Sequence, residues 1–249
     1  MHLPSLNLLL HFIDFVLFFG RSWLVNPHFA LATIPHFIVY RWEAYRFFTA
    51  PLVNTSILSL LFSFLSFSDT GRRLEQSMGS ASFGWTCLIM GLATNTMFCT
   101  ICVLLGVVFQ NASFLLWSSS GLWTILFGLL AAECLLAPRN SQRLLFFAKV
   151  PVRWYPVALC VLFGLMSGNI LSLPYFLSLG VGYAWGFGYL NELKLSPSKA
   201  KQWEDTVLAN FAQREGWIAS HASTGCEAWS DMGGADDSSS QRSSVCRIS

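Results

Sequence analysis

The stretch Trp117-Ser118-Ser119-Ser120-Gly121-Leu122-Trp123 places three consecutive serines and a glycine within an apolar run that extends over residues 112–137. Inside a membrane helix, small residues of this kind let neighbouring backbones approach closely, and their hydroxyls can hydrogen-bond across helices. The stretch therefore predicts a helix in the interior of a helical membrane bundle, with Ser120 and Gly121 at a close crossing.

The composition of the whole chain predicts a membrane protein. Of 249 residues, 54% are hydrophobic and 11% are charged, whereas charged residues make up about a quarter of a soluble domain. The formal net charge is only +2, so bulk electrostatics predict no nucleic-acid partner. Membrane lipid is the expected partner of the apolar surface.

Six apolar stretches approach or exceed the roughly 20 residues that a helix needs to span a bilayer. They cover residues 5–25, 50–68, 82–109, 112–137, 154–172 and 173–191. The expected fold is therefore all-α, a polytopic bundle of six transmembrane helices, in which the last stretch is the marginal one. The first stretch could instead be a cleaved signal peptide ending near Ala30-Leu31-Ala32, but Met1 to Asn7 contains no Lys or Arg.

The positions of Lys and Arg predict the orientation of the helices. If the N-terminus is cytosolic, nine basic residues lie in cytosolic connections and three lie on the opposite side, and basic residues favour the cytosolic side. Both termini are therefore expected in the cytosol. The nine are Arg72, Arg73, Arg139, Arg143, Lys149, Arg153, Lys194, Lys199 and Lys201, and the three are Arg21, Arg41 and Arg46.

Three regions differ in composition. Residues 1–193 form the expected transmembrane domain, in which the aromatic and partly charged loop 26–48 is expected to lie at the membrane boundary. Residues 194–220 have the amphipathic spacing of a cytosolic helix. Residues 221–249 are rich in Gly, Ser and Asp, which is typical of a disordered tail.

The cysteines predict no disulfide framework and no metal site. Seven cysteines are present, an odd number without paired CxxC spacing, and most lie within apolar runs. Buried thiols that pack as small hydrophobic groups explain this pattern better. We expect neither a metal nor another cofactor.

Several motifs, taken in order, resemble those of the rhomboid intramembrane serine proteases over roughly residues 5–193. Trp42-Glu43-Ala44-Tyr45-Arg46-Phe47-Phe48-Thr49 is similar to the aromatic and arginine motif before the second helix of that family, and Leu74 to Ser80 is similar to the turn after it. Ser118-Ser119-Ser120-Gly121 resembles the GxSG motif with its first glycine replaced, and Tyr155-Pro156 and a glycine-rich last helix follow. The most similar subgroup is the eukaryotic rhomboid-like proteins related to derlins.

The resemblance implies roles for particular residues. It places Ser120 at the nucleophile position and Tyr175 at the position of the family histidine, while Asn54, Ser59 and Ser63 fall at positions that stabilise the oxyanion. A neutral tyrosine, with a pKa near 10, is a poor general base. No histidine occurs between His36 and His221, so only His28 or His36 in the first loop could replace the base.

Glycines at four-residue spacing predict close helix packing. Gly182 and Gly186 form such a pair in the last stretch, and Gly164 and Gly168 form another in the stretch before it. With these glycines, the Ser118 to Gly121 segment is explained by packing more readily than by catalysis.

Three classes of function are consistent with these patterns. The resemblance favours a catalytically inactive rhomboid-like protein of the endoplasmic reticulum or Golgi, which binds transmembrane segments of client proteins and affects their folding, trafficking or degradation, with degradation or trafficking machinery as a partner of the tail. An active rhomboid serine endopeptidase is the alternative. An unrelated channel or carrier is disfavoured, because intramembrane charges are confined to Asp14 and Glu133.

Overall fold

A computed structural model describes residues 30–54, 57–137, 142–145, 148–166, 172–206, 208 and 217–218. A few side chains within these ranges, including that of Ser59, are not described. The expected first span, residues 5–25, and the expected tail, residues 221–249, lie outside the described residues.

The described chain is mainly helical, which confirms the predicted fold class at this level. Its helices are α3 (Pro35–Arg41), α4 (Arg46–Thr49), α5 (Ile57–Met78), α6 (Ser80–Val108), α7 (Trp123–Leu136), α8 (Tyr155–Met166), α9 (Leu173–Gly186) and α10 (Pro197–Thr206). The sequence did not predict the antiparallel hairpin of β1 (Gln142–Leu145) and β2 (Ala148–Pro151), which lies in the connection between α7 and α8.

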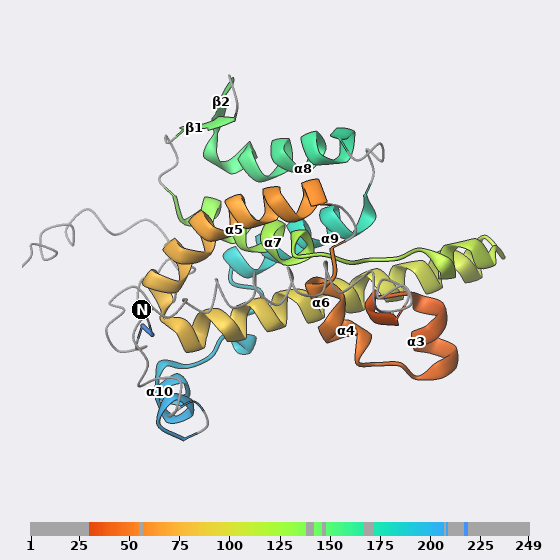
Figure 1. Cartoon of the computed structure of the whole chain (residues 1–249), viewed down its shortest axis with the longest axis horizontal. Helices are drawn as coiled ribbons and strands as arrows, with labels where there is room; N and C mark the ends of the chain where they lie inside the picture. The colour runs from red at the N-terminus through yellow and green to blue at the C-terminus, as the bar shows by residue number, and fades with distance from the viewer. Residues whose placement is uncertain are drawn as a thin grey trace, which may run out of the picture.

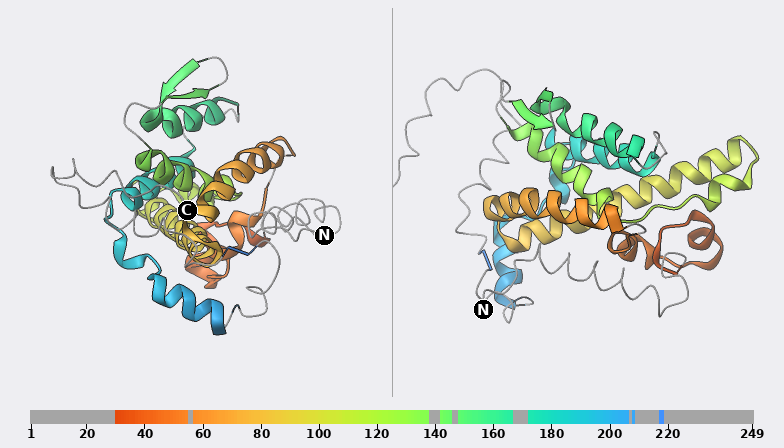
Figure 2. Two further views of the ribbon diagram at one scale, coloured as in Figure 1. Left: turned by 90° about the vertical axis from the view of Figure 1, so that its left-hand side faces the viewer. Right: turned by 45° about the horizontal axis from the view of Figure 1, so that its top comes forward.

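Helix α7 is the centre of the bundle. It contacts α5, α6, α8 and α9, and both its large aromatic side chains, Trp123 and Phe127, are almost fully buried. α3 and α4 lie at one end of the bundle, whereas α10 and the β-hairpin lie at the other (Figure 1). Figure 2 shows the same separation of the two ends from other directions.

The turn between α5 and α6 forms where the motif Leu74 to Ser80 predicts it. Gly79 has φ 84°, a left-handed conformation that glycine adopts without steric cost, so α5 ends at Met78 and the chain reverses. The hydroxyl of Ser80 donates to Oε1 of Glu75 at 2.8 Å, and this carboxylate is almost fully buried. The acidic residue and the glycine of the motif therefore fix the hairpin together.

Among the described helices, α6 alone is both long and apolar enough to cross a bilayer by itself. Its 29 residues extend about 43 Å at 1.5 Å per residue. α7 and α9 have 14 residues each, about 21 Å, which is shorter than the roughly 30 Å hydrocarbon layer. Six transmembrane spans therefore stay a prediction, which the lengths of the described helices do not confirm.

Two predicted helix starts were wrong. The stretch expected to begin at residue 50 turns through a 3-10 segment, Ala50–Leu52, and its helix begins at Ile57. The stretch expected to begin at residue 112 forms a second 3-10 segment, Ala112–Leu116, and becomes α-helical only at Trp123. Hydropathy does not distinguish an α-helix from a 3-10 segment, because both can occur in an apolar stretch. Irregular backbone is tolerated there when its polar groups are bonded within the protein.

The segment after the bundle folds back onto the end of α6. The indole Nε1 of Trp85 donates to the carbonyl of Leu193 at 2.8 Å, and its ring meets that of Trp203 of α10 edge-on at 5.3 Å. The expected amphipathic helix over 194–220 is thus present in part, as α10, with its aromatic side chain against the bundle.

Candidate functional site

Residues 117–120 form an extended segment that leads into a turn at Gly121, and both are bonded to the N-terminal part of the chain. Ser119 pairs with Thr33 as an antiparallel bridge, with N to O distances of 3.0 and 2.9 Å. The amide of Gly121 donates to the carbonyl of Ala50 at 2.9 Å. These bonds satisfy backbone groups that would be costly to leave unpaired in an apolar environment.

Gly121 is required by its conformation and by its neighbour. Its φ of +95° disfavours any residue with a Cβ, and a Cβ at this position would lie 2.8 Å from Oδ1 of Asn54. Asn54 is itself buried. The structure therefore brings together two of the residues singled out in the sequence, with Ser120 next to them in the chain.

The hydroxyl of Ser120 makes no hydrogen bond to another residue in the described part of the chain, and the residue is only partly buried. The neighbouring serine is the one held in a network. Ser119 Oγ donates to Oδ1 of Asn95 at 3.2 Å, and Nδ2 of Asn95 donates to the carbonyl of Phe47 at 3.0 Å. Asn95 was not predicted as a site residue, although a lone amide inside the apolar run 82–109 is a signal of a polar contact between helices.

Tyr175 lies in the hydrophobic core. Its ring packs against Phe127 of α7 at a centroid distance of 5.2 Å. The polar contact between α7 and α9 is made one turn further along, where Ser178 Oγ donates to the carbonyl of Thr124 at 2.5 Å. Ser178 was not predicted as a site residue. The sequence signal for its polar contact is its position three residues after Tyr175.

The remaining oxyanion positions are less available than the sequence suggested. The hydroxyl of Ser63 is buried and donates to the carbonyl of Leu60 within α5, at 2.8 Å. The side chain of Ser59 lies outside the described residues. Of the three positions, Asn54 is the one that the structure places beside the Ser120-Gly121 turn.

His36 is the one histidine within the described ranges. Its ring contacts those of Phe37 and Tyr40, with centroid distances of 5.6 and 4.9 Å. It belongs to α3 and makes no hydrogen bond with Ser120. His28, the other candidate base, lies outside the described residues.

Gly182 and Gly186 lie at close contacts between α9 and α7. A Cβ on Gly182 would collide with the carbonyl oxygen of Gly128 and would lie 2.7 Å from its Cα, so the two backbones are in contact. A Cβ on Gly186 would lie 2.6 Å from the side chain of Leu135. Gly164 is buried in α8, and Gly168 lies outside the described residues.

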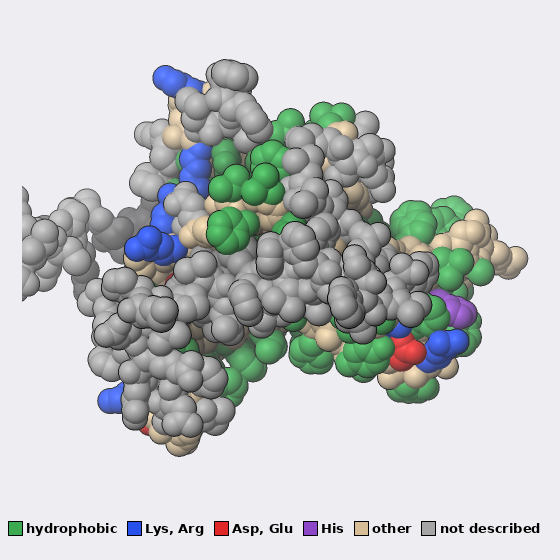
Figure 3. All heavy atoms as spheres, viewed as in Figure 1, with side chains coloured by type: hydrophobic (Ala, Val, Ile, Leu, Met, Phe, Trp, Pro, Cys, Tyr) green, Lys and Arg blue, Asp and Glu red, His purple; other side chains and the backbone are tan. Residues whose placement is uncertain are grey.

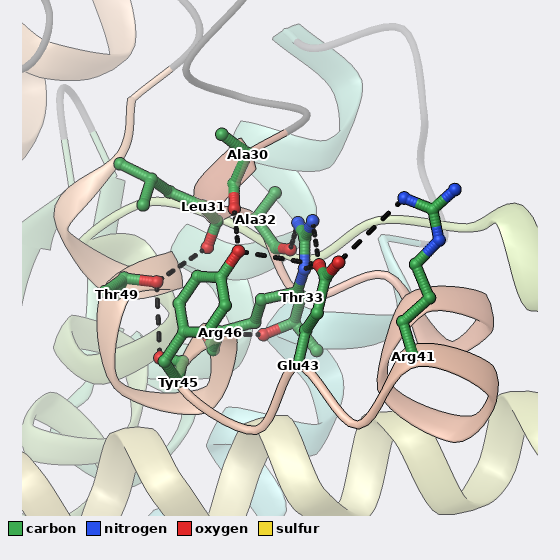
Figure 4. A network of polar contacts seen from close by, with 9 residues as sticks. All are labelled: Ala30, Leu31, Ala32, Thr33, Arg41, Glu43, Tyr45, Arg46 and Thr49. Carbon is green, nitrogen blue, oxygen red and sulfur yellow. Dashed lines mark hydrogen bonds and ion pairs between the residues drawn. The ribbon is translucent and has the colours of Figure 1, made fainter.

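Arg46 anchors the first loop from inside the protein (Figure 4). The residue is 4% exposed, its Nη1 donates to the carbonyl of Ala32 at 3.0 Å, and its Nε donates to Glu43 at 2.6 Å. The hydroxyl of Thr33 donates to the carbonyl of Arg46 at 3.2 Å. Since Thr33 also pairs with Ser119, the guanidinium of Arg46 positions the strand that holds the serine segment.

The site therefore has a rigid frame. A serine follows an extended, paired strand, a glycine with positive φ turns the chain into α7, and an asparagine amide lies against that turn. Such a frame could orient a carbonyl group, but acyl transfer also requires a base in contact with the serine hydroxyl.

A helical membrane bundle with a serine-glycine turn of this kind at the start of a buried helix defines a rhomboid-like membrane protein. A family model described as "Eukaryotic integral membrane protein (DUF1751)" matches residues 5–216, and the chain belongs to this family. Rhomboid-like protein 15 of Arabidopsis thaliana is 25% identical over 170 residues, which are 68% of this chain and 42% of that relative. The chain thus spans less than half the length of the curated relative that it matches.

Proposed function

We propose that the protein is a catalytically inactive rhomboid-like membrane protein that binds transmembrane segments of client proteins and affects their folding, trafficking or degradation. The observation that carries the proposal is the isolation of the Ser120 hydroxyl, which bonds to no other described residue. The neighbouring polar groups on α6 and α9, Asn95 and Ser178, are used in structural hydrogen bonds instead.

The chemistry supports the inactive assignment. A serine hydroxyl is a weak nucleophile until a base removes its proton, and a serine and its base act as a unit, so that losing one removes most of the rate. The family histidine position, assigned to Tyr175, has a ring in van der Waals contact with Phe127. The active endopeptidase remains the alternative, with His28 or His36 as its base.

Client binding is supported by the exposed apolar surface of the bundle. Leu61, Phe64 and Leu65 of α5 are between 42% and 56% exposed, and Leu165 of α8 is 54% exposed. In a bilayer these side chains face lipid or the helix of another protein, which associate with them by van der Waals packing. The proposal also comprises six spans, an endoplasmic reticulum or Golgi location and cytosolic termini.

Covalent labelling tests the absence of nucleophilic activity. We expect a fluorophosphonate or isocoumarin probe to leave Ser120 unlabelled in the purified full-length protein in detergent, because no described residue bonds to the hydroxyl as a base would. The measurement is in-gel fluorescence followed by peptide mass spectrometry, with an active rhomboid protease as the positive control. Labelling of the natural protein that is absent from Ser120→Ala would overturn the inactive assignment and favour the endopeptidase.

Client binding is tested by two substitutions with opposite expected effects. Ser120→Ala removes a hydroxyl that no described residue uses, so client co-purification should be unchanged. Gly182→Leu should abolish it, because no side chain fits between the backbones of α7 and α9. Loss of co-purification in Ser120→Ala, with its thermal stability unchanged, would show that the hydroxyl itself carries function.

A further inference from the structure

A cavity of about 430 Å³ lies between α5, α7 and α8, on the far side of α7 from α6 and away from the Ser120 turn. Its polar lining consists of two guanidinium groups, Arg73 of α5 and Arg143 of β1, and three hydroxyl groups, those of Ser66, Thr70 and Tyr155. Every one of these five side chains can donate a hydrogen bond. The cavity is therefore rich in donors that suit an oxyanion.

The rest of the lining is apolar, and part of it lies away from Arg73. Along α5, Leu65 precedes Arg73 by eight residues, or about 12 Å. Along α8, Tyr155 is the first residue and Leu159 is one turn further into the bundle. Leu126 and Leu130 of α7 complete the apolar end. The cavity thus has a charged mouth and a hydrophobic floor.

The hydroxyl groups in this cavity are not used by the protein. Thr70 is only 5% exposed, and yet its hydroxyl makes no hydrogen bond to any residue that the structure describes. The same holds, within the described ranges, for Ser66 and Tyr155. These hydroxyl groups are therefore able to donate to a polar ligand in the cavity.

The charge at the mouth is positive. Arg143 forms an ion pair with Glu133, with Nη2 to Oε1 at 2.6 Å, and its guanidinium lies 5.7 Å from the centre of the Tyr155 ring. Glu133 repels an anion, but Arg73 and Arg143 provide an opposing attraction. The exposed Arg72, Lys149 and Arg153 lie at the same end of the bundle and add to it. Figure 3 shows Lys and Arg side chains gathered along this edge, beside hydrophobic side chains.

We propose that this cavity binds an anionic phospholipid, with its phosphate held by Arg73, Arg143 and the hydroxyls and the start of an acyl chain against the leucine floor. Two guanidinium groups with neutral donors are the usual recognition set for phosphate oxygens. A basic pocket between membrane helices, open at the level of the lipid headgroups, is the setting in which anionic lipids bind.

The apolar floor favours a lipid over a soluble phosphate. Leu65, at the floor, is 56% exposed, and the nearby Leu61 and Leu165 are 55% and 54% exposed, so the cavity adjoins a surface that faces acyl chains. A soluble anion would use only the charged mouth. A phospholipid uses both ends, and the gain from burying its chain is about 0.8 kcal/mol for each CH₂ group.

Native mass spectrometry of the full-length protein in detergent micelles tests the proposal, with dioleoyl phosphatidic acid and dioleoyl phosphatidylcholine as the two lipids. We expect phosphatidic acid to bind at least tenfold more tightly. Arg73→Gln should weaken its binding about tenfold, the change expected from losing one charge-assisted hydrogen bond. Arg72→Gln is the matched control, since it removes the same charge from the next residue of α5, which does not line the cavity.

Two further measurements separate the cavity from general charge attraction and from misfolding. Thr70→Val keeps the shape and charge of the cavity and should still weaken phosphatidic acid binding. The double variant Glu133→Gln with Arg143→Gln removes the second guanidinium group without leaving the Glu133 carboxylate unpaired. Equal losses in Arg72→Gln and Arg73→Gln would overturn the proposal in favour of surface attraction. Glycerol 3-phosphate binding as tightly as phosphatidic acid would overturn it in favour of a soluble anion. These readouts do not depend on whether Ser120 is reactive.

Discussion

At the scale of single residues, the bundle requires glycine at two positions where a Cβ would collide with a neighbouring residue. Gly182 allows α9 to touch the backbone of α7 at Gly128, and Gly121 turns the chain from the extended segment into α7 with a φ of +95°. In both places a single Cβ would collide with a neighbour from a distant part of the sequence. Small residues at these points are therefore conditions for the bundle to close.

Two glycines of α9 offer a direct comparison. We expect Gly182→Ala to destabilise the protein by about 1–3 kcal/mol through overpacking, because its Cβ would overlap the Gly128 backbone. Gly180→Ala should be neutral or slightly stabilising, because a Cβ there meets no described residue within 4 Å and alanine favours helix. Thermal aggregation in detergent measures both. Equal midpoints for the two variants would show that α7 and α9 are not in backbone contact.

At the scale of elements, the first loop and the serine segment form one unit. Thr33 bridges to Ser119, Arg46 donates to the carbonyl of Ala32, and Asn95 of α6 bonds to both Ser119 and Phe47. Arg46 is buried with its charge balanced by Glu43. The ion pair of Arg46 with Glu43 thus holds the first loop against the interior of the bundle.

The two arginines that contact Glu43 should differ in importance. Arg46→Gln leaves Glu43 without its main partner and removes the bond to Ala32, so we expect a loss of about 3 kcal/mol, as for other broken buried ion pairs. Arg41 is 66% exposed and lies 4.0 Å from Glu43, so Arg41→Gln should change stability by less than about 1 kcal/mol.

Thermal unfolding followed by intrinsic tryptophan fluorescence measures this difference, because Trp42 belongs to the same loop. Arg46→Lys is a useful third variant, since it keeps the charge and loses the planar geometry that serves two acceptors. If Arg41→Gln were as damaging as Arg46→Gln, the loop would be held by surface charge and not by the buried guanidinium.

At the scale of the whole molecule, the two ends of the bundle have different chemical character. The end with α3 and α4 carries exposed aromatic side chains, including Trp42 at 88% and Tyr40 at 65% exposure. The opposite end carries the β-hairpin, α10 and the basic residues around Arg73 and Arg143. Basic residues concentrated at one end are what the positive-inside rule leads one to expect of a protein held across a bilayer.

The arrangement leads to a prediction about topology. Because basic residues are concentrated at the end with α10, we expect that end and both termini to face the cytosol, with six spans in all. Protease protection of tags at each terminus in sealed microsomes should show that both tags are digested. A protected tag at either end would contradict the even number of spans.

Several features of the fold were predictable because their signals are local. The apolar stretches that become α6 and α7, the glycine turn at Gly79 and the four-residue spacing of Gly182 and Gly186 depend on hydropathy and backbone conformation at neighbouring positions. The rhomboid-like family was predictable from the order of short motifs, and the family comparison confirms it. The roles assigned to Ser120 and Tyr175 are still predictions.

The sequence by itself determined the membrane class and the helical fold. Only the tertiary structure decided where α7 begins, which serine is bonded to Asn95, and that Arg73, Arg143 and three unused hydroxyls surround one cavity. The physical reason is that hydropathy and glycine spacing act over a few residues. Hydrogen bonds and cavities join residues far apart in the chain, and their geometry exists only once the helices have packed.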